Sequence, residues 1–318
     1  MFDPSELTRK KSLRLFTSLK AGGPAELFYQ ARTVDDLAEA SIYAQQNDIP
    51  TTILGGGSNI LPSDQGVPGL VILNSTKAIE FQEGGVVISD SGVVLQELFL
   101  KTLQANLAGL EYCVGIPGSV GGALVSNAGA YRSNISEFLN EIEIAYQGKR
   151  EWVSPDFMQF SYRDSILRKS DAPQATLLRI KFKLPTGDPK SMYDEAREYQ
   201  RQRISKQPPS ASAGSFFKNV YDKSLAESLT NLPENLKSAG VVPAGYLIES
   251  CGLKGRRRGG AMIGARHANF LLNAAGATAT ELRQLANFAS DTVKKKYGVQ
   301  LEEEVLYLGD WSRYLPMA

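Results

Sequence analysis

One segment of the chain places a hydroxyl group among residues that can make it reactive. Ser215 lies between a glycine and two phenylalanines, and Lys218 and Asn219 follow directly. Glycine permits close approach of a ligand, the aromatic rings exclude water, and the polar pair can hold an anion or an amide. Taken alone, the segment is more typical of a helix N-cap followed by core aromatics. Its interpretation therefore depends on the motifs upstream.

Two glycine-rich segments upstream have the composition of phosphate-binding loops. Gly55–Asn59 reads Gly-Gly-Gly-Ser-Asn and follows a predicted strand, but no Gly-Lys-Ser/Thr follows and Ile60 replaces the last glycine of the dinucleotide fingerprint. Its backbone N–H groups can form an anion nest, although a tight turn explains this motif equally well. Residues 115–123 form the second segment, and Asn127–Tyr131 follows closely. Two such segments favour a dinucleotide bound between them over purely structural turns.

Composition narrows the class of protein. The chain has 318 residues, 42% hydrophobic and 22% charged, which suits two or three folded domains. Its net charge of +1 creates no field for nucleic acid or membrane, and no apolar run is long enough to span a bilayer. Cys113 and Cys251 lack metal spacing, and a single histidine, His267, disfavours a zinc site and a Ser-His-Asp hydrolase. With no signal peptide expected, the predicted location is the cytoplasm.

Hydrophobic periodicity predicts a mixture of strands and helices. Strands are expected at 25–29, 51–54, 69–73, 85–89, 177–184, 261–264, 269–273 and near 299–308. Helices are expected at 34–46, 95–104, 191–203 and from about Thr280 to Lys296. Thr33 should cap the first helix, whereas Thr280 lacks the acidic residue of a capping box. Residues 207–210, Gln-Pro-Pro-Ser, mark a candidate domain junction.

Motifs along nearly the whole chain resemble the UDP-N-acetylenolpyruvoylglucosamine reductases, flavoenzymes that complete UDP-N-acetylmuramate synthesis for peptidoglycan. They are Gly22–Ala25, Gly55–Leu61, Gly115–Tyr131, Tyr162–Ser165, Ala213–Asn219, Ile248–Gly255, His267–Phe270 and Leu301–Val305. The interval of 50 residues from Ser165 to Ser215 (215 − 165) is similar to the family's second type, which lacks an extra tyrosine-bearing substrate loop. Val220 and Pro62 depart from the family pattern without touching a reacting group.

The resemblance implies an α+β protein with a flavin-binding fold of the vanillyl-alcohol-oxidase (PCMH) type. Two α+β subdomains, 1–75 and 76–205, would bind FAD, and a C-terminal α+β domain, 206–308, would bind substrate. The tail, 309–318, would return to the first subdomain. FAD is the implied cofactor, NADPH the implied reductant, and no metal is expected.

The reaction implied is the reduction of UDP-N-acetylglucosamine enolpyruvate to UDP-N-acetylmuramate, with hydride passing from flavin N5 to the vinyl carbon. The resemblance assigns protonation of the adjacent carbon to Ser215, and stabilisation of the enolate to Arg163 and Glu304. Arg163 suits this role because a guanidinium is always charged and binds carboxylates bidentately. Without the family, an ion pair with Asp164 would be preferred. Lys218 or Arg163 would supply the positive field that Ser215 needs.

The resemblance also implies two sets of binding residues. Those for the cofactor are Gly55, Gly56, Gly57, Ser58, Asn59, Gly115, Gly118, Ser119, Gly121, Gly122, Asn127, Ala128 and Gly129. Those for the substrate are Tyr162, Lys206, Asn219 and His267. His267 is equally interpreted as a packed histidine bonded to backbone, and Arg256–Arg258 as a solvated loop rather than a diphosphate site.

Two other functions stay open on the sequence. One is a different FAD-linked oxidoreductase of the same fold, which would not need Arg163, Ser215 and Glu304 together. The other is a non-catalytic sensor of flavin or nucleotide sugar, against which the presence of all three residues argues. The expected partners are the enolpyruvyl substrate and NADPH, with no nucleic acid and no membrane, and the expected state is a monomer.

Overall fold

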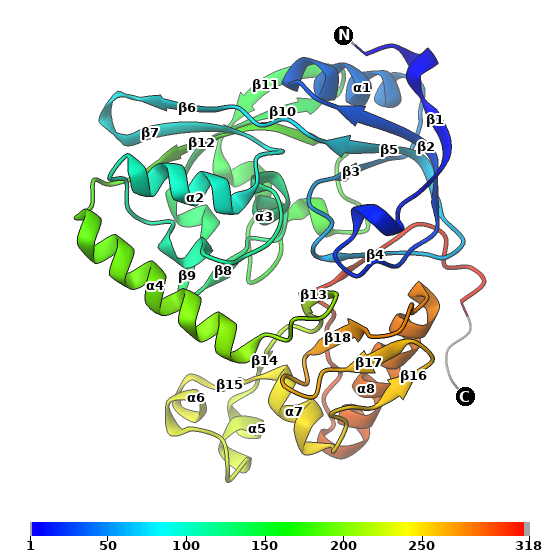
Figure 1. Ribbon diagram of the computed structural model, residues 1–318, viewed down its shortest axis with the longest axis vertical. Helices are drawn as coiled ribbons and strands as arrows, with labels where there is room; N and C mark the ends of the chain where they lie inside the picture. The colour runs from blue at the N-terminus through cyan, green and yellow to red at the C-terminus, as the bar shows by residue number, and fades with distance from the viewer. Residues whose placement is uncertain (1, 315–318) are drawn as a thin grey trace. The chain divides into compact units, whose positions relative to one another are not determined.

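The computed structural model describes residues 2–314, which form two compact units (Figure 1). The N-terminal unit consists of residues 2–11, 25–57 and 68–205, and the C-terminal unit of residues 12–24, 58–67 and 206–314. Both mix helices and strands, as an α+β protein should. The boundaries expected at residues 75 and 308 stay predictions, and residues 315–318 of the expected tail lie outside the described residues.

The first sheet of the N-terminal unit leads the chain into the first glycine segment. Its order is β1 (Thr8–Ser12), β2 (Pro24–Ala31), β5 (Val67–Asn74) and β3 (Thr51–Leu54). β3 runs parallel to β5, and α1 (Val34–Gln46) packs on the sheet through Leu37 and Ala40. The Thr33 hydroxyl accepts a hydrogen bond from Asp36 N, and the Asp36 carboxylate accepts one from Thr33 N, forming the predicted cap. β3 therefore ends directly at Gly55.

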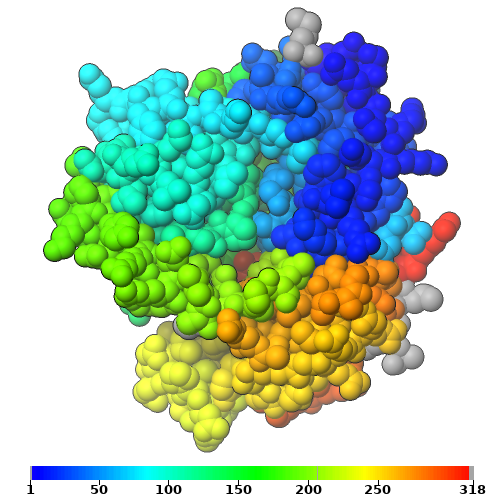
Figure 2. Space-filling view, viewed as in Figure 1, coloured from blue at the N-terminus to red at the C-terminus, as the bar shows by residue number. Residues whose placement is uncertain are grey.

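The second sheet carries the second glycine segment and the Arg163 turn. Its antiparallel order is β11 (Lys149–Val153), β10 (Leu139–Tyr146), β12 (Thr176–Lys183), β7 (Val86–Asp90) and β6 (Ile79–Gln82). Fully buried Ile142 and Ile180 face each other across β10 and β12 and pack with α2 (Leu95–Gln104) and α3 (Val120–Val125). The short strands β8 (Gly129–Ala130) and β9 (Ser133–Asn134) follow α3. α4 (Pro189–Lys206) exposes most of its side chains and is visible in green in Figure 2.

The C-terminal unit is built around a sheet that begins at the Ser215 segment. Its order is β13 (Ser212–Ser215), β18 (Phe270–Asn273), β17 (Ala261–Ile263) and β16 (Arg257–Arg258). The core joins Phe216 and Leu271 to α7 (Ala244–Ser250) and α8 (Ala279–Tyr297). β19 (Leu306–Leu308) pairs in parallel with β4 (Ile60–Pro62). The remaining elements are β14 (Val220–Tyr221), α5 (Lys223–Ser228), α6 (Glu234–Ala239) and β15 (Val241–Val242).

Most of the predicted elements are confirmed, and two details are wrong. Helices 34–46 and 95–104 have the predicted bounds. The last helix begins at Ala279, and its capping box is formed by Thr278 and Glu281 rather than being absent, because the cap lies two residues earlier than expected. The last strand covers only 306–308, since residues 302–304 meet a single irregular segment through isolated hydrogen bonds instead of a regular ladder.

The two cysteines, Cys113 and Cys251, are both free thiols. Cys113 is fully buried, and burial raises the pKa of its thiol to about 12. Cys251 is half-buried, and burial also raises its pKa. Both therefore behave as small apolar residues near neutral pH. In a separate observation, no helix within residues 2–314 has the length and apolar character needed to cross a membrane.

The cap of α8 gives a stability prediction. Thr278 Oγ1 accepts from Glu281 N and the Glu281 carboxylate accepts from Thr278 N, each at 3.1 Å. Thr278→Ala should lower the free energy of unfolding by about 1 kcal/mol, measured by urea denaturation followed by circular dichroism. Thr278→Ser keeps the oxygen and serves as the control, and an alanine variant as stable as the serine one would refute the prediction.

Candidate active site

The two glycine segments meet main chain to main chain within the N-terminal unit. A Cβ atom on Gly56 would lie 2.8 Å from Gly118 Cα, and one on Gly55 would lie 2.1 Å from Ser119 Oγ. Side chains do not tolerate such distances, so only glycine lets these backbones touch. Gly115 and Gly118 have φ values of +70° and +121°, which glycine adopts readily. The segments thus form one continuous surface of backbone groups.

A buried acceptor beside this surface calls for a ligand. Ser119 caps α3, its Oγ accepting from Gly122 N at 3.2 Å. Asn127 has a left-handed backbone with φ 42°, and its Nδ2 donates to the Ser161 carbonyl at 3.1 Å. Its Oδ1 is buried and has no hydrogen-bond partner among residues 2–314. An unsatisfied acceptor costs free energy, and a hydroxyl or N–H group of FAD would satisfy it. The residues present therefore fit the implied cofactor.

The predicted cofactor residues divide between the two units. Gly55–Gly57 and the predicted residues from Gly115 to Gly129 lie in the N-terminal unit, whereas Ser58 and Asn59 lie in the C-terminal unit. Gly121 approaches Ser91 so closely that a Cβ would lie 2.9 Å from the serine Cβ. Asn59 contacts the Glu304 segment, its Nδ2 donating to the Glu304 carbonyl at 3.1 Å. The role of each in binding FAD stays a prediction.

Arg163 is held by main-chain carbonyl groups of the stretch that follows the second glycine segment. Its Nη1 donates to the Asn127 carbonyl at 3.2 Å, and its Nη2 donates to the Gly129 carbonyl. Arg163 lies in a tight turn closed by two hydrogen bonds between Ser161 and Asp164, and its φ of 55° is left-handed. A non-glycine residue in that conformation carries strain, which surrounding contacts must hold. The turn therefore fixes the direction of the guanidinium.

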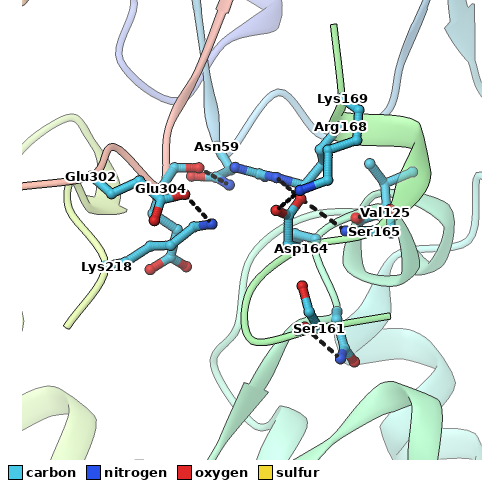
Figure 3. A network of polar contacts seen from close by, with 12 residues as sticks. Asn59, Val125, Ser161, Asp164, Ser165, Arg168, Lys169, Lys218, Glu302 and Glu304 are labelled. Carbon is cyan, nitrogen blue, oxygen red and sulfur yellow. Dashed lines mark hydrogen bonds and ion pairs between the residues drawn. The ribbon is translucent and has the colours of Figure 1, made fainter. Parts of the chain in front are cut away.

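Neighbouring polar contacts anchor the Arg163 turn. Asp164 forms ion pairs with Arg168 at 3.5 Å and with Lys169 at 2.5 Å. The Ser165 hydroxyl donates to the Val125 carbonyl at 2.6 Å, which ties the turn to the end of α3 (Figure 3). Asp164 thus pairs with two cations close to its own turn, and main-chain carbonyl groups orient the Arg163 guanidinium.

The segments of Ser215 and Glu304 meet in the C-terminal unit. Ser215 ends β13 opposite Phe270 of β18 and is half-buried. Glu304 N donates to the carbonyl of Phe216, the next residue, at 2.8 Å. The segments that carry the two predicted catalytic residues are therefore joined by a backbone hydrogen bond.

Lys218 does not stand alone as a cation beside Ser215. Its Nζ forms an ion pair with Glu302 at 2.6 Å, with the lysine side chain 8% exposed and the glutamate 70% exposed (Figure 3). Lys218 N also donates to the Glu302 carbonyl at 2.8 Å. The paired carboxylate offsets part of the lysine's positive field.

Asn269 is a positioning residue that the sequence reasoning did not single out. It is buried, its Oδ1 accepts from Phe217 N at 3.0 Å, and its Nδ2 donates to the Phe217 carbonyl at 2.8 Å. Its own carbonyl accepts from Phe216 N at 2.7 Å. A single asparagine within the apolar run 268–272 was the available signal, since a buried amide in a strand needs backbone partners.

The predicted substrate residues have different surroundings. Tyr162 is exposed, with Arg163 Cζ 5.6 Å from its ring centroid. Asn219 Oδ1 accepts from Ala244 N at 3.3 Å. His267 Nδ1 accepts from Asn269 N at 3.2 Å and its ring packs on Phe270, so one nitrogen is bonded to backbone as the alternative interpretation expects. Lys206 ends α4, at the start of the C-terminal unit. Their contacts with substrate stay predictions.

Comparisons with known proteins agree with this arrangement. Residues 25–148 match the FAD binding domain family, and residues 206–308 match the C-terminal domain of UDP-N-acetylenolpyruvoylglucosamine reductase. The UDP-N-acetylenolpyruvoylglucosamine reductase of Rubrobacter xylanophilus is 34% identical over 94% of each chain. That of a Synechococcus strain is 36% identical over 93% of this chain and 89% of the relative. The crystal structure of the Thermus caldophilus enzyme superimposes with a TM-score of 0.75 at 30% identity, covering 95% of this chain and 98% of that one.

The fold and the glycine surface define an FAD-dependent oxidoreductase with the predicted α+β flavin-binding fold. Sequence identity above 30% over almost the full length of this chain identifies one family within that class. The chain belongs to the UDP-N-acetylenolpyruvoylglucosamine reductase family, and that prediction is confirmed.

The contact between glycine segments predicts how cofactor binding responds to one methyl group. Gly56→Ala overpacks the contact with Gly118, at a cost of about 1–3 kcal/mol, so the dissociation constant for FAD should rise roughly ten- to a hundredfold. Flavin fluorescence on titrating apoprotein with FAD measures it. Gly148→Ala adds left-handed strain in an open turn of the same unit, with nothing nearer than 3.9 Å, and should leave FAD affinity unchanged. Equal affinity in both variants would contradict the assignment.

Proposed function

We propose that this chain catalyses the NADPH-dependent reduction of UDP-N-acetylglucosamine enolpyruvate to UDP-N-acetylmuramate in peptidoglycan precursor synthesis. Family membership supports the reaction class. The observation that carries the assignment of residues is the pairing of the Ser215 and Glu304 segments through the Phe216 carbonyl, at 2.8 Å from Glu304 N. That hydrogen bond places the segment that carries the Ser215 hydroxyl beside the segment that carries the Glu304 carboxyl. Protonation of a carbon next to a carboxylate requires a proton donor close to a group that stabilises the enolate.

Bound FAD, once reduced by NADPH, would supply the hydride. Arg163 would stabilise the negative charge that develops on the substrate carboxylate. Two of its N–H groups are directed by the carbonyls of Asn127 and Gly129, so the plane of the guanidinium is set before substrate arrives. A preorganised cation needs no reorganisation when charge develops, and such electrostatic stabilisation is usually a large part of catalysis. Lysine at this position would keep the charge and lose the planar fork.

Ser215 would give its proton to the carbon adjacent to the reduced one. A serine is a weak acid, so it can act only against a strongly basic carbon and near positive charge. Glu304 would assist by stabilising the enolate, with its backbone held by Phe216 and Asn59.

The proposal also covers the residues that contact the ligands and the state in which the chain acts. Asn219, His267, Tyr162 and Lys206 are proposed to contact the substrate, and the glycine segments to bind FAD. The chain is proposed to act as a cytoplasmic monomer, without nucleic acid or membrane partners. The proposed domain arrangement has two FAD-binding subdomains and a substrate-binding domain from residue 206.

The proposed function is tested by following flavin absorbance near 450 nm in an anaerobic stopped-flow instrument. NADPH should bleach the purified holoenzyme, and UDP-N-acetylglucosamine enolpyruvate should restore the absorbance. Bleaching without recovery would assign the chain to another electron acceptor, and a protein that never takes up FAD would refute the flavin assignment.

The role of Ser215 gives a prediction that separates the two half-reactions. Ser215→Ala should leave bleaching by NADPH intact, because no proton from Ser215 is used there. Recovery with the enolpyruvyl substrate should slow by about 10²–10⁴-fold. Ser228→Ala, which removes an exposed hydroxyl of α5 in the same unit, is the control. Equal slowing of both half-reactions would instead mark Ser215 as structural.

A further inference from the structure

Three aromatic rings enclose the guanidinium of Arg283, a residue of α8. Arg283 Cζ lies 4.5 Å from the ring centroids of Tyr307 and Trp311 and 4.3 Å from that of Tyr314. Its Nε and Nη1 atoms are buried and form no hydrogen bond with any residue from 2 to 314. Ring faces attract a cation, most strongly when it is desolvated. We call Arg283, Tyr307, Trp311 and Tyr314 the arginine cage.

The rings of the cage support one another and are tied to backbone and helix. Tyr307 and Trp311 lie 5.5 Å apart edge to face, and Trp311 and Tyr314 lie 5.9 Å apart in the same manner. Trp311 Nε1 donates to the Leu308 carbonyl at 3.0 Å, and Asn287 of α8 donates to the Tyr314 hydroxyl at 2.7 Å. The segment from Tyr307 to Tyr314 is therefore folded around one arginine.

The cage also touches the segment that carries the proposed catalytic residues. The Tyr307 ring lies 6.3 Å from the ring of Phe216, which is fully buried and directly follows Ser215. The Phe216 carbonyl accepts from Glu304 N, and only two residues separate Glu304 from Tyr307. Close-packed interiors transmit displacement, so a shift of Tyr307 would be felt at both Ser215 and Glu304.

We propose that Arg283 is a positioning residue for the reaction. By holding Tyr307 against Phe216, it keeps the Ser215 hydroxyl and the Glu304 carboxyl in the geometry that protonation needs. This inference rests on the proposed function, and Arg283 itself acts through Tyr307 rather than on the substrate. The rate of the half-reaction with the enolpyruvyl substrate should therefore depend on the Arg283 cation that the three rings enclose.

Hydrogen exchange tests the structural half of this proposal without any reaction. In Arg283→Met, the amides of Glu304 and Leu306, which donate to Phe216 and Asn59, should exchange at least about tenfold faster. Lys296→Met is the matched control, since Lys296 lies on the same helix, exposed, 5.2 Å from the single ring of Tyr297. Unchanged exchange over 302–308 in Arg283→Met would overturn the inference, whatever the enzyme turns over.

The two half-reactions test the functional half. Holoenzyme carrying Arg283→Met should be bleached by NADPH at nearly the wild-type rate, while recovery with UDP-N-acetylglucosamine enolpyruvate should slow at least about tenfold. Tyr307→Phe keeps the ring and should behave as wild type, whereas Tyr307→Leu should reproduce the arginine variant. A lower melting temperature with both half-reactions unchanged would reduce Arg283 to a stabilising residue and overturn the proposal.

Failure of the inference and failure of the proposed function give different results. A wild-type flavin that the enolpyruvyl substrate cannot reoxidise would refute the proposed function, and hydrogen exchange alone would then decide the positioning role. If Arg283→Met does not fold, Tyr307→Leu carries both measurements from the other side of the contact. Arg283→Lys keeps the charge without the planar guanidinium and should lie between Arg283→Met and wild type.

Discussion

Contact between main-chain groups is the constraint on which the candidate residues of each unit depend. Gly56 meets Gly118 with no side chain between them, and the Asn127 and Gly129 carbonyls direct the Arg163 guanidinium. In the C-terminal unit, the Phe216 carbonyl accepts from Glu304 N. Backbone atoms are placed by the fold itself, so groups held by them lose little orientation to side-chain freedom. The chemistry proposed for this chain uses that placement.

The two units achieve this placement by different means. In the N-terminal unit, glycines allow close approach, and strained left-handed residues, Asn127 and Arg163, carry the functional groups. In the C-terminal unit, buried aromatic and amide side chains hold an irregular segment in place. Asn269 bonds to both backbone groups of Phe217, and the Tyr307 ring of the arginine cage lies 6.3 Å from the Phe216 ring. An irregular segment lacks a regular ladder, so such side chains must supply its order.

Much of this organisation could be predicted from the sequence because it is local. The helix of residues 34–46 was predicted from the spacing of its apolar residues and from the Thr33 cap. The glycine segments indicated that the backbone approaches other groups closely there. The family motifs select Arg163, Ser215 and Glu304 as candidates. The strand expected over 299–308 was too long, because pairing with residues 216–218 is a long-range contact that periodicity does not contain. The hydrogen bonds between Asn269 and Phe217 and the contacts of the arginine cage were not predicted for the same reason, because they join residues that are distant in the sequence.

The surroundings of the two candidate cations could be seen only in the fold. From sequence, Lys218 and Arg163 were equal candidates for the positive field beside the reacting groups. The ion pair between Lys218 and Glu302 offsets part of the lysine's charge, and two neutral carbonyl groups direct the Arg163 guanidinium. An ion pair weakens the electric field of a cation more than hydrogen bonds to neutral carbonyl groups do.

The most direct test of the account is to identify the product formed in D2O. The holoenzyme, NADPH and UDP-N-acetylglucosamine enolpyruvate are incubated anaerobically, and the product is examined by NMR. The account predicts UDP-N-acetylmuramate with one deuterium on the carbon that bears the ether oxygen and the carboxylate, because that proton comes from an exchangeable hydroxyl. Unchanged substrate, or deuterium found only on the methyl carbon, would contradict it.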